Sequence, residues 1–392
     1  MIKNAIIVSL LLLSSLISFG QENNKLDKFF NKKMRRAGII GMQVGYINDS
    51  QEWHQGYGVK NYETQKRVND STLFMIASCS KPVTALAILK LYDQGKINLD
   101  DNINNYLPFS ITNPFYPTDS ITFRMLLTHT SSLQDNWEIM DPLYTVETGG
   151  DSSIKLSDYI KDYFLPSGKF YCANKNFLNK KPGEYWEYSN MGYALLGLLI
   201  ENISGSTFSE FMLNEIFIPL KMNNSYWFLK DIPHDNIAHP HKLPEKNTDF
   251  TQPKVLKHYG YPDFPDGQLR TTVKDYIQIV KLILNKGLVS NKRFIKEETI
   301  NLFHTVQFPS VNKYQAIAWN FNEFENGLYY LLMPRLPSHT GGDPGVATVV
   351  SYNPKNKTGA IVFLNSPPVT FRGGKILYLD IPRKLLNLAK QK

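Results

Sequence analysis

The segment Phe74-Met-Ile-Ala-Ser-Cys-Ser-Lys81, followed by an apolar run from Val83 to Tyr92, constrains the fold of this chain more than any other feature. Ser78 and Lys81 are three residues apart, a spacing that places both side chains on one face at the start of a helix. Gly95 follows the run and is typical of a left-handed helix cap. Because the run is apolar on nearly every side, we expect a buried helix that holds a serine beside a lysine.

A serine hydroxyl becomes a good nucleophile only when a neighbouring base takes its proton. A lysine in a partly desolvated site can have its pKa lowered enough to be that base, so Ser78 and Lys81 form a candidate catalytic pair. Cys79 is a poor alternative nucleophile, because a lysine at plus two does not share its helical face; we expect Cys79 in the core. It and Cys172 are the two cysteines of the chain, which permits a disulfide without requiring one.

The N-terminus has the pattern of an export signal. Lys3 is the one charge in an otherwise apolar start, the stretch from Ala5 to Leu16 is apolar, and Ser18-Phe-Gly20 supplies small residues for cleavage before Gln21. The apolar stretch is short for a membrane span, although an uncleaved anchor is the alternative. We therefore predict a signal peptide over residues 1–20, a mature chain over 21–392, and a periplasmic or secreted protein.

The distribution of charge argues against a nucleic-acid partner. The net charge of +8 is spread along the 392 residues, with no long basic run and no basic patch interleaved with aromatic residues. We expect no nucleic-acid partner, no cofactor, no stable membrane span after processing, and a monomer that acts on a small-molecule or peptide substrate. His239-Pro-His241 has no carboxylate or cysteine at supporting spacing, so we expect no metal site.

Strand patterns lie at both ends of the chain and helical patterns lie between them. We predict hairpins at 41–57, 316–333 and 346–365, an N-terminal helix beginning near Leu26, helices at 121–130 and 191–203, and a final helix at 383–390. The predicted fold is α/β (α+β): an antiparallel β-sheet flanked by helices, with a mostly helical insertion. The sheet subdomain takes about 21–98 plus 266–392, and the insertion about 99–265.

Two further motifs follow the Ser78-Cys-Ser-Lys81 motif in the chain. They are Tyr188-Ser-Asn190, just before the helix at 191–203, and His339-Thr-Gly-Gly342, before a predicted strand. Taken singly, each tyrosine, asparagine or histidine is more often structural than catalytic. The order of the three motifs, together with linking segments such as Gly95-Lys-Ile-Asn-Leu-Asp-Asp101, resembles the serine β-lactamase and penicillin-binding-protein-like family. This family includes class C β-lactamases, D-alanyl-D-alanine carboxypeptidases and esterases.

The resemblance implies a role for each motif residue. Ser78 would form an acyl-enzyme, Lys81 would accept its proton, and Tyr188, with a lowered pKa, would relay a proton and later activate water. The substrate-binding residues would be Asn190, His339, Thr340 and Gly341, and the small residues Gly341 and Gly342 would let the substrate lie against the strand edge. The backbone N–H groups of Ser78 and Gly342 would form the oxyanion hole, while His129 would be structural.

One departure bears on the substrate. His339 stands where most β-lactamases carry lysine, and a histidine is only partly charged near neutrality. We therefore expect cleavage of amides or esters such as D-amino-acid peptides, with pH-dependent binding of a substrate carboxylate. A class C β-lactamase and a non-catalytic penicillin- or peptidoglycan-binding protein are the alternatives.

We expect the walls of the substrate cleft to include Trp137, residues 259–261 and residues 266–270, with Arg270 as a possible cation. Residues 166–180 would either shape the cleft or pack on the surface.

Overall fold

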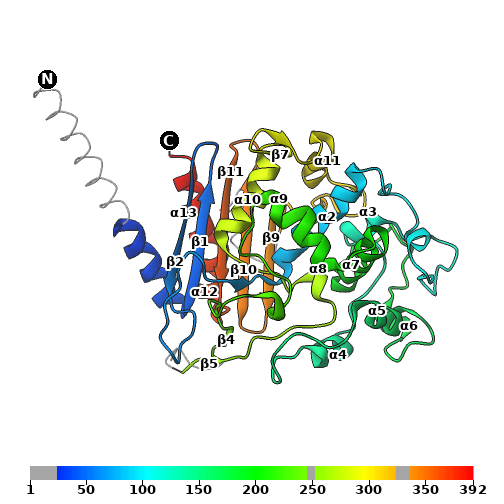
Figure 1. Cartoon of the computed structure of the whole chain (residues 1–392), viewed down its shortest axis with the longest axis horizontal. Helices are drawn as coiled ribbons and strands as arrows, with labels where there is room; N and C mark the ends of the chain where they lie inside the picture. Colours follow the sequence, from blue (N-terminus) through cyan, green and yellow to red (C-terminus); the bar gives the residue numbers. More distant parts are fainter. Residues whose placement is uncertain (1–23, 245–251, 324–334, 392) are drawn as a thin grey trace, which may run out of the picture.

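The computed structural model describes residues 24–244, 252–323 and 335–391. One five-stranded sheet has the strand order β2-β1-β11-β10-β9, and every neighbouring pair is antiparallel. The strands are β1 (Gly41–Ile47), β2 (Glu52–Gly58), β9 (Ser338–Asp343), β10 (Val346–Asn353) and β11 (Thr358–Leu364). Figure 1 shows the blue N-terminal strands beside the orange C-terminal strands, so both ends of the chain build the sheet, as predicted.

Helices cover both faces of this sheet (Figure 1). On one face, α13 (Ile381–Ala389) and the helical residues 24–37 bury apolar side chains against β1, β10 and β11. On the other face, α10 (Val273–Leu284) packs on β1 and β11. Its core continues into α2 (Lys81–Asp93) without a break. The sheet is therefore the middle layer of three.

The regular secondary structure between β2 and α10 is mainly helical, with long loops between the helices. It contains α3 (Phe123–Leu127), α4 (Trp137–Met140), α5 (Leu156–Phe164), α6 (Ala173–Asn176), α7 (Asn190–Ser204), α8 (Phe208–Phe211), the π-helical turn η4 (Met212–Phe217) and α9 (Ile218–Leu220). Two short helices, α11 (Glu297–Asn301) and α12 (Phe371–Lys375), lie later in the chain. Short strand pairs join β3 (Phe74–Met75) to β6 (Arg270–Thr271), β4 (His241–Lys242) to β5 (Lys254–Val255), and β7 (Leu288–Val289) to β8 (Lys292–Arg293).

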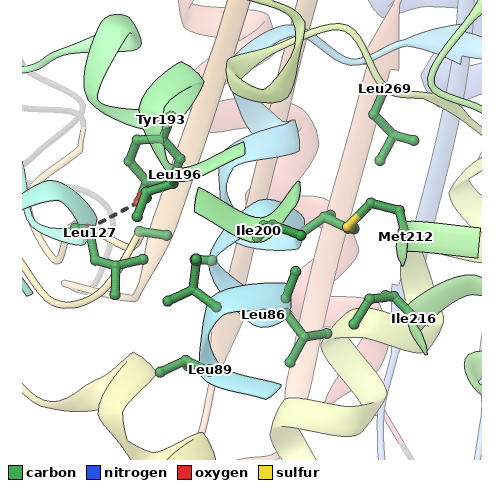
Figure 2. Close-up of a cluster of buried hydrophobic side chains, with 14 of the residues drawn as sticks. Leu86, Leu89, Leu127, Tyr193, Leu196, Ile200, Met212, Ile216 and Leu269 are labelled. Carbon is green, nitrogen blue, oxygen red and sulfur yellow. Dashed lines mark hydrogen bonds between the residues drawn. The ribbon is translucent and has the colours of Figure 1, made fainter. Parts of the chain in front are cut away.

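The buried helix predicted after Ser78 is α2, which continues from the 3₁₀ turn η1 (Ala77–Ser80). Its apolar side chains share one core with those of α7 and η4, and Figure 2 shows Leu86 on the side of α2 that faces Ile200 and Ile216. The hydroxyl of Tyr193 on α7 donates to the carbonyl of Leu127 at 3.0 Å. Packing on all sides makes α2 a rigid support for the residues at its N-terminus.

The predicted hairpins have mixed outcomes. Those at 41–57 and 346–365 are confirmed as β1–β2 and β10–β11. The predicted strand at 316–321 is wrong: this segment makes only isolated bridges through Asn320, and Ala318 has a φ of +57°, which an extended strand cannot accommodate. Its partner strand at 328–333 and the signal peptide at 1–20 lie outside the described residues. No helix in the described ranges is long and apolar enough to cross a membrane.

Candidate active site

Ser78 lies at the junction of a strained turn and a buried helix. Ala77, the residue before it, has a φ of +48°, a left-handed conformation that costs a non-glycine residue free energy. Strand β3 leads into this turn and is held by β6. The surrounding structure therefore fixes Ser78 in one place at the start of α2.

Lys81 is fully buried and touches the candidate nucleophile directly. Its Nζ donates to Ser78 Oγ at 3.0 Å, to Asn190 Oδ1 at 2.6 Å and to the backbone carbonyl of Asp266 at 3.0 Å. The Nζ also lies 4.9 Å from the centroid of the Tyr188 ring. The first two motifs, far apart in the sequence, therefore meet around one amino group.

The ring of Tyr188 lies over this amino group and is held in place by a stacking contact. His129 stacks on it with centroids 4.4 Å apart and an interplanar angle of 27°. Burial raises the pKa of Tyr188 well above its ordinary value, and the hydrogen bond with Ser78 opposes this only in part. The lowered pKa expected from the sequence is therefore wrong: the phenol is neutral in the free protein and can donate a proton.

The N-terminus of α7 explains why Asn190 can reach Lys81. The N-cap is Ser189, whose Oγ accepts from the N–H of Gly192 at 3.0 Å. Asp135 adds a second cap by accepting from the N–H groups of Asn190 at 2.9 Å and Met191 at 3.0 Å. The amide of Asn190 is therefore not needed as a cap and points instead to the lysine. Asp135 carried no signal in the sequence, because it reaches α7 only through the tertiary fold.

The edge strand β9 brings the third motif beside Ser78. The N–H of Thr340 donates away from β10, to Glu323 Oε1 at 2.9 Å, and the Thr340 hydroxyl donates to the same oxygen at 2.7 Å. Alternate residues of a strand direct their N–H groups to the same side. The N–H of Gly342, two residues on, therefore also points outward from the sheet, as an oxyanion donor requires.

The two glycines of this motif have different roles. A Cβ on Gly341 would lie 2.5 Å from the carbonyl oxygen of Ile76 and 3.1 Å from the nitrogen of Ser78, whereas one on Gly342 would meet nothing within 4 Å. Gly341 thus allows β9 to approach the turn before Ser78. The prediction that Gly341 makes room for substrate is corrected, since its missing side chain faces the protein.

His339 is buried and neutral. Its Nδ1 lies 2.6 Å from the carbonyl oxygen of Thr340, which can only accept, so Nδ1 carries the proton. Burial, with a smaller contribution from the charge of Lys81, lowers the pKa of His339 to about 3. The expected partly charged histidine that binds a substrate carboxylate is therefore wrong, because a buried imidazole beside a lysine does not take up a proton near neutrality.

A cleft with two lobes opens at Ser78. Lobe A, of about 660 Å³, includes His129, His339 and Glu323 in its lining. Lobe B, of about 480 Å³, is lined by 13 residues: Ser78, Gln134, Asp135, Trp137, Tyr144, Glu187, Tyr188, Asn190, Tyr261, Asp266, Gly267, Gly342 and Asp343. Both lobes include Ser78, Tyr188 and Gly342, so a substrate can extend to either side of the serine.

Some of the expected cleft walls are correct and others are not. Trp137 and Tyr261 line lobe B as predicted. Tyr259 and Arg270 are wrong: neither lines lobe A or lobe B, and Arg270 donates to backbone carbonyls, including that of Trp227 at 3.3 Å. Residues 166–180, all of them described, line neither lobe. In that segment Asn176 donates to the carbonyl of Tyr163 at 2.7 Å, so it packs on α5.

Asp266 belongs to the site around Ser78, although the sequence indicated it only as part of the cleft wall at 266–270. Its Oδ2 lies 3.7 Å from Lys81 Nζ, and the side chain is almost fully buried. Burial raises the pKa of Asp266 to about 7, although the charge of Lys81 acts in the opposite direction. A single aspartate outside any motif gives no local signal, and only the tertiary contact reveals it.

Cys79, His239 and His241 line neither lobe of the cleft. Cys79 is completely buried, its Sγ is 3.4 Å from the carbonyl of His339, and burial raises its pKa to about 12, as expected for a core residue. His241 Nε2 accepts from the N–H of Tyr62 at 3.1 Å. The described residues contain no group of three or more His, Cys, Asp or Glu side chains that could hold a metal.

The fold and the arrangement around Ser78 define the class of the protein. The sequence model of the family described as Beta-lactamase matches residues 26–381. The chain therefore belongs to the beta-lactamase family, which also includes penicillin-binding proteins. Related proteins of this fold are serine hydrolases, among them beta-lactamases and DD-peptidases.

The relatives are distant and the solved neighbours share the fold. Protein flp of Staphylococcus aureus (strain N315) is 25% identical over 342 residues, covering 87% of this chain and 62% of that protein. The chain thus spans less than two thirds of this relative. A penicillin-binding protein homologue from Pyrococcus abyssi, described as octameric, has a TM-score of 0.71 at 24% identity, over 93% of this chain and 79% of that one. D-amino acid amidase from Ochrobactrum anthropi SV3 has a TM-score of 0.70 at 19% identity, over 94% and 97%.

Proposed function

We propose that this protein is an exported serine hydrolase that forms an acyl-enzyme on Ser78 and cleaves amide or ester bonds of small substrates such as D-amino-acid peptides or esters. The observation that carries the proposal is the 3.0 Å hydrogen bond between Lys81 Nζ and Ser78 Oγ, inside a buried network at the meeting point of two lobes. Export is supported by the pattern of residues 1–20 and by the periplasmic or secreted location typical of the family.

The proposed reaction begins with attack by Ser78 Oγ on the substrate carbonyl. Lys81 reacts as the free amine, after one of its three protons has left for solvent. A bond forms between Oγ and the carbonyl carbon, and the Ser78 proton passes to this amine. The developing oxyanion accepts hydrogen bonds from the N–H groups of Ser78 and Gly342. The bond to the leaving nitrogen or oxygen then breaks as that atom takes a proton from the neutral Tyr188, which regains one from Lys81. In the second half, water gives a proton to the free amine of Lys81 as its oxygen attacks the ester carbon. The bond to Ser78 Oγ breaks, and Oγ takes that proton from Lys81.

Asn190 and Thr340 are proposed to orient the substrate on opposite sides of Ser78. The Asn190 Oδ1 is occupied by Lys81 at 2.6 Å, which leaves its Nδ2 free to donate to a substrate carbonyl within lobe B. Thr340 lines lobe A, where the leaving group would lie. The carboxylate of Glu323 beside Thr340 makes this side unfavourable for an anionic leaving group.

The same charges favour an ester or amide over a β-lactam. His339 is neutral, and none of the described residues that line lobes A and B is lysine or arginine. A β-lactam antibiotic carries a carboxylate, which would find no cation on the cleft surface. A class C β-lactamase is therefore the weaker alternative. A protein that binds its ligand without acylation would not need a lysine hydrogen-bonded to Ser78.

The test is a comparison of kcat/KM for a p-nitrophenyl ester, a D-alanyl-D-alanine peptide and a cephalosporin, with wild type and Ser78→Ala. We expect kcat/KM for the ester, which carries no carboxylate, to exceed that for the cephalosporin and that for the peptide, whose leaving D-alanine is anionic. Turnover of the ester should fall at least about 10³-fold in Ser78→Ala. The best kcat/KM for the cephalosporin would establish a β-lactamase instead. Turnover of no substrate, with stoichiometric acylation by a labelled penicillin, would establish a binding protein.

A further inference from the structure

Lobe B is strongly acidic. Four of the residues that line it are carboxylic acids, namely Asp135, Glu187, Asp266 and Asp343, and none of the described lining residues is lysine or arginine. Asp135 is already engaged in capping α7. Glu187 is exposed to solvent. The two remaining acids, Asp266 and Asp343, lie deeper in the site and are not explained by the proposed acyl transfer.

Asp266 has a carboxylate oxygen without a partner. The residue is 3% exposed, and its Oδ1 makes no hydrogen bond to any described residue, whereas its Oδ2 faces Lys81 at 3.7 Å. A buried acceptor that makes no hydrogen bond costs free energy. Lys81 cannot supply that bond easily, because its three N–H groups already donate to Ser78, Asn190 and the Asp266 backbone. The position therefore suits a donor that arrives with the substrate.

Asp343 places a second acid beside the reacting carbonyl. It ends β9 directly after Gly342, the proposed oxyanion donor, and its Oδ2 accepts from the hydroxyl of Tyr261 at 3.0 Å. Gly267 preserves this bond, because a Cβ there would lie 2.3 Å from the Tyr261 hydroxyl. A group attached to the carbon next to the scissile carbonyl would thus enter lobe B close to Asp343.

The charges of these two acids are incompletely balanced. Burial raises the pKa of Asp266 to about 7 and that of Asp343 to about 8, and the charge of Asp266 is the second cause acting on Asp343. Among the described residues, the charge of Lys81 opposes the rise at Asp266, and the charges of Lys81 and of the buried Arg270 oppose it at Asp343. A second cation in lobe B would favour the ionised forms of both acids and would form charge-assisted hydrogen bonds, which are stronger than neutral ones.

We infer that lobe B binds a protonated amine on the acyl part of the substrate, with Asp343 and Asp266 as its partners. The inference rests on the proposed function and narrows its substrates to esters and amides of amino acids with a free amino group. The amine lies on the carbon next to the carbonyl that Ser78 attacks, and it stays in lobe B as the leaving group departs through lobe A.

Three p-nitroanilides that differ in their acyl group test this inference: D-alanyl, N-acetyl-D-alanyl and propionyl. We expect kcat/KM for the free amine to exceed that for either uncharged compound by at least about tenfold, the effect of one charge-assisted hydrogen bond. Asp343→Asn should reduce the ratio of free-amine to N-acetyl kcat/KM about tenfold, mainly through KM. Glu187→Gln, which removes an exposed acid of the same lobe, should leave the ratio unchanged.

Equal kcat/KM for the amine and its uncharged analogues would overturn the amine subsite. So would a ratio that falls equally in Asp343→Asn and Glu187→Gln, because a general negative potential would then be responsible. If Asp343→Asn does not fold, Asp266→Asn gives the same ratio test, since loss of turnover common to all substrates cancels in it. If Ser78 turns over the N-acetyl compound or a p-nitrophenyl ester without any preference for the amine, the amine subsite is wrong. The proposed serine hydrolase activity is then still supported.

Discussion

The Nζ of Lys81 lies 3.7 Å from Oδ2 of Asp266, and both side chains are buried. Lys81→Met would leave the aspartate without its cation, so we expect the free energy of unfolding to fall by about 3 kcal/mol and kcat to fall at least about 10³-fold. In Lys81→Met/Asp266→Asn, stability should partly return while turnover stays lost. Denaturant titration and kinetics measure both; turnover within a few-fold of wild type would make Lys81 structural.

Tyr188→Phe removes a hydroxyl and keeps the ring that stacks on His129 at 4.4 Å. We expect kcat to fall about 10²- to 10⁴-fold, the range for loss of a general acid, with little change in Tm. Because the pKa of Tyr188 is raised above its ordinary value of 10.0, the pH profile of wild-type kcat/KM should show no step from Tyr188 ionisation below that pH. An unchanged kcat in Tyr188→Phe would exclude the tyrosine from proton transfer.

The two adjacent glycines of β9 provide a matched pair. Gly341→Ala would place a Cβ 2.5 Å from the carbonyl oxygen of Ile76 and would push β9 away from Ser78, whereas Gly342→Ala meets no atom within 4 Å. We expect Gly341→Ala to lower both Tm and kcat, and Gly342→Ala to leave Tm unchanged. Thermal unfolding of the two variants checks this. Equal Tm values would show that the approach of β9 to Ser78 is not tight.

Glu323 should make stability depend on pH. Removal from water raises its pKa to about 7, against the opposing effects of the Thr340 hydrogen bonds and of the Lys81 charge. A carboxyl whose folded pKa is raised contributes stability at low pH that is lost as pH rises through about 7. Glutamine can still accept from Thr340 and carries no charge. The Tm of Glu323→Gln relative to wild type should therefore increase from pH 5 to pH 8.

A control for this effect is Glu63→Gln, which changes a solvent-exposed glutamate. Its Tm relative to wild type should stay constant over the same pH range. A constant difference for Glu323→Gln as well would mean that the Glu323 carboxylate is well solvated in the folded protein, and that Thr340 is held without an electrostatic cost.

The sequence predicted what depends on local pattern and order. The buried α2, the two outer hairpins and the meeting of Ser78, Lys81, Tyr188 and Asn190 followed from apolar periodicity and from three ordered motifs. These features were accessible because the residues that define them are neighbours in the chain, or because the resemblance to a family placed the motifs together.

The remaining features depend on burial and on contacts between distant segments. The charge of His339 and the pKa of Tyr188 were predicted wrongly, because both are set by the surroundings rather than by residue type. Arg270 was predicted as a cation of the cleft, but the fold buries its guanidinium among backbone carbonyls. Asp266 and Glu323 reach Lys81 and Thr340 from other parts of the chain, and a single acid outside a motif gives no sequence signal.

The most direct test of the account is covalent labelling with a fluorophosphonate, followed by mass spectrometry of the modified peptide. Wild type should carry one adduct on Ser78, Ser78→Ala should carry none, and Cys79→Ser, which changes the buried neighbour, should be labelled like wild type. An adduct that persists in Ser78→Ala, or that maps to another residue in wild type, would contradict the assignment of Ser78 as the nucleophile.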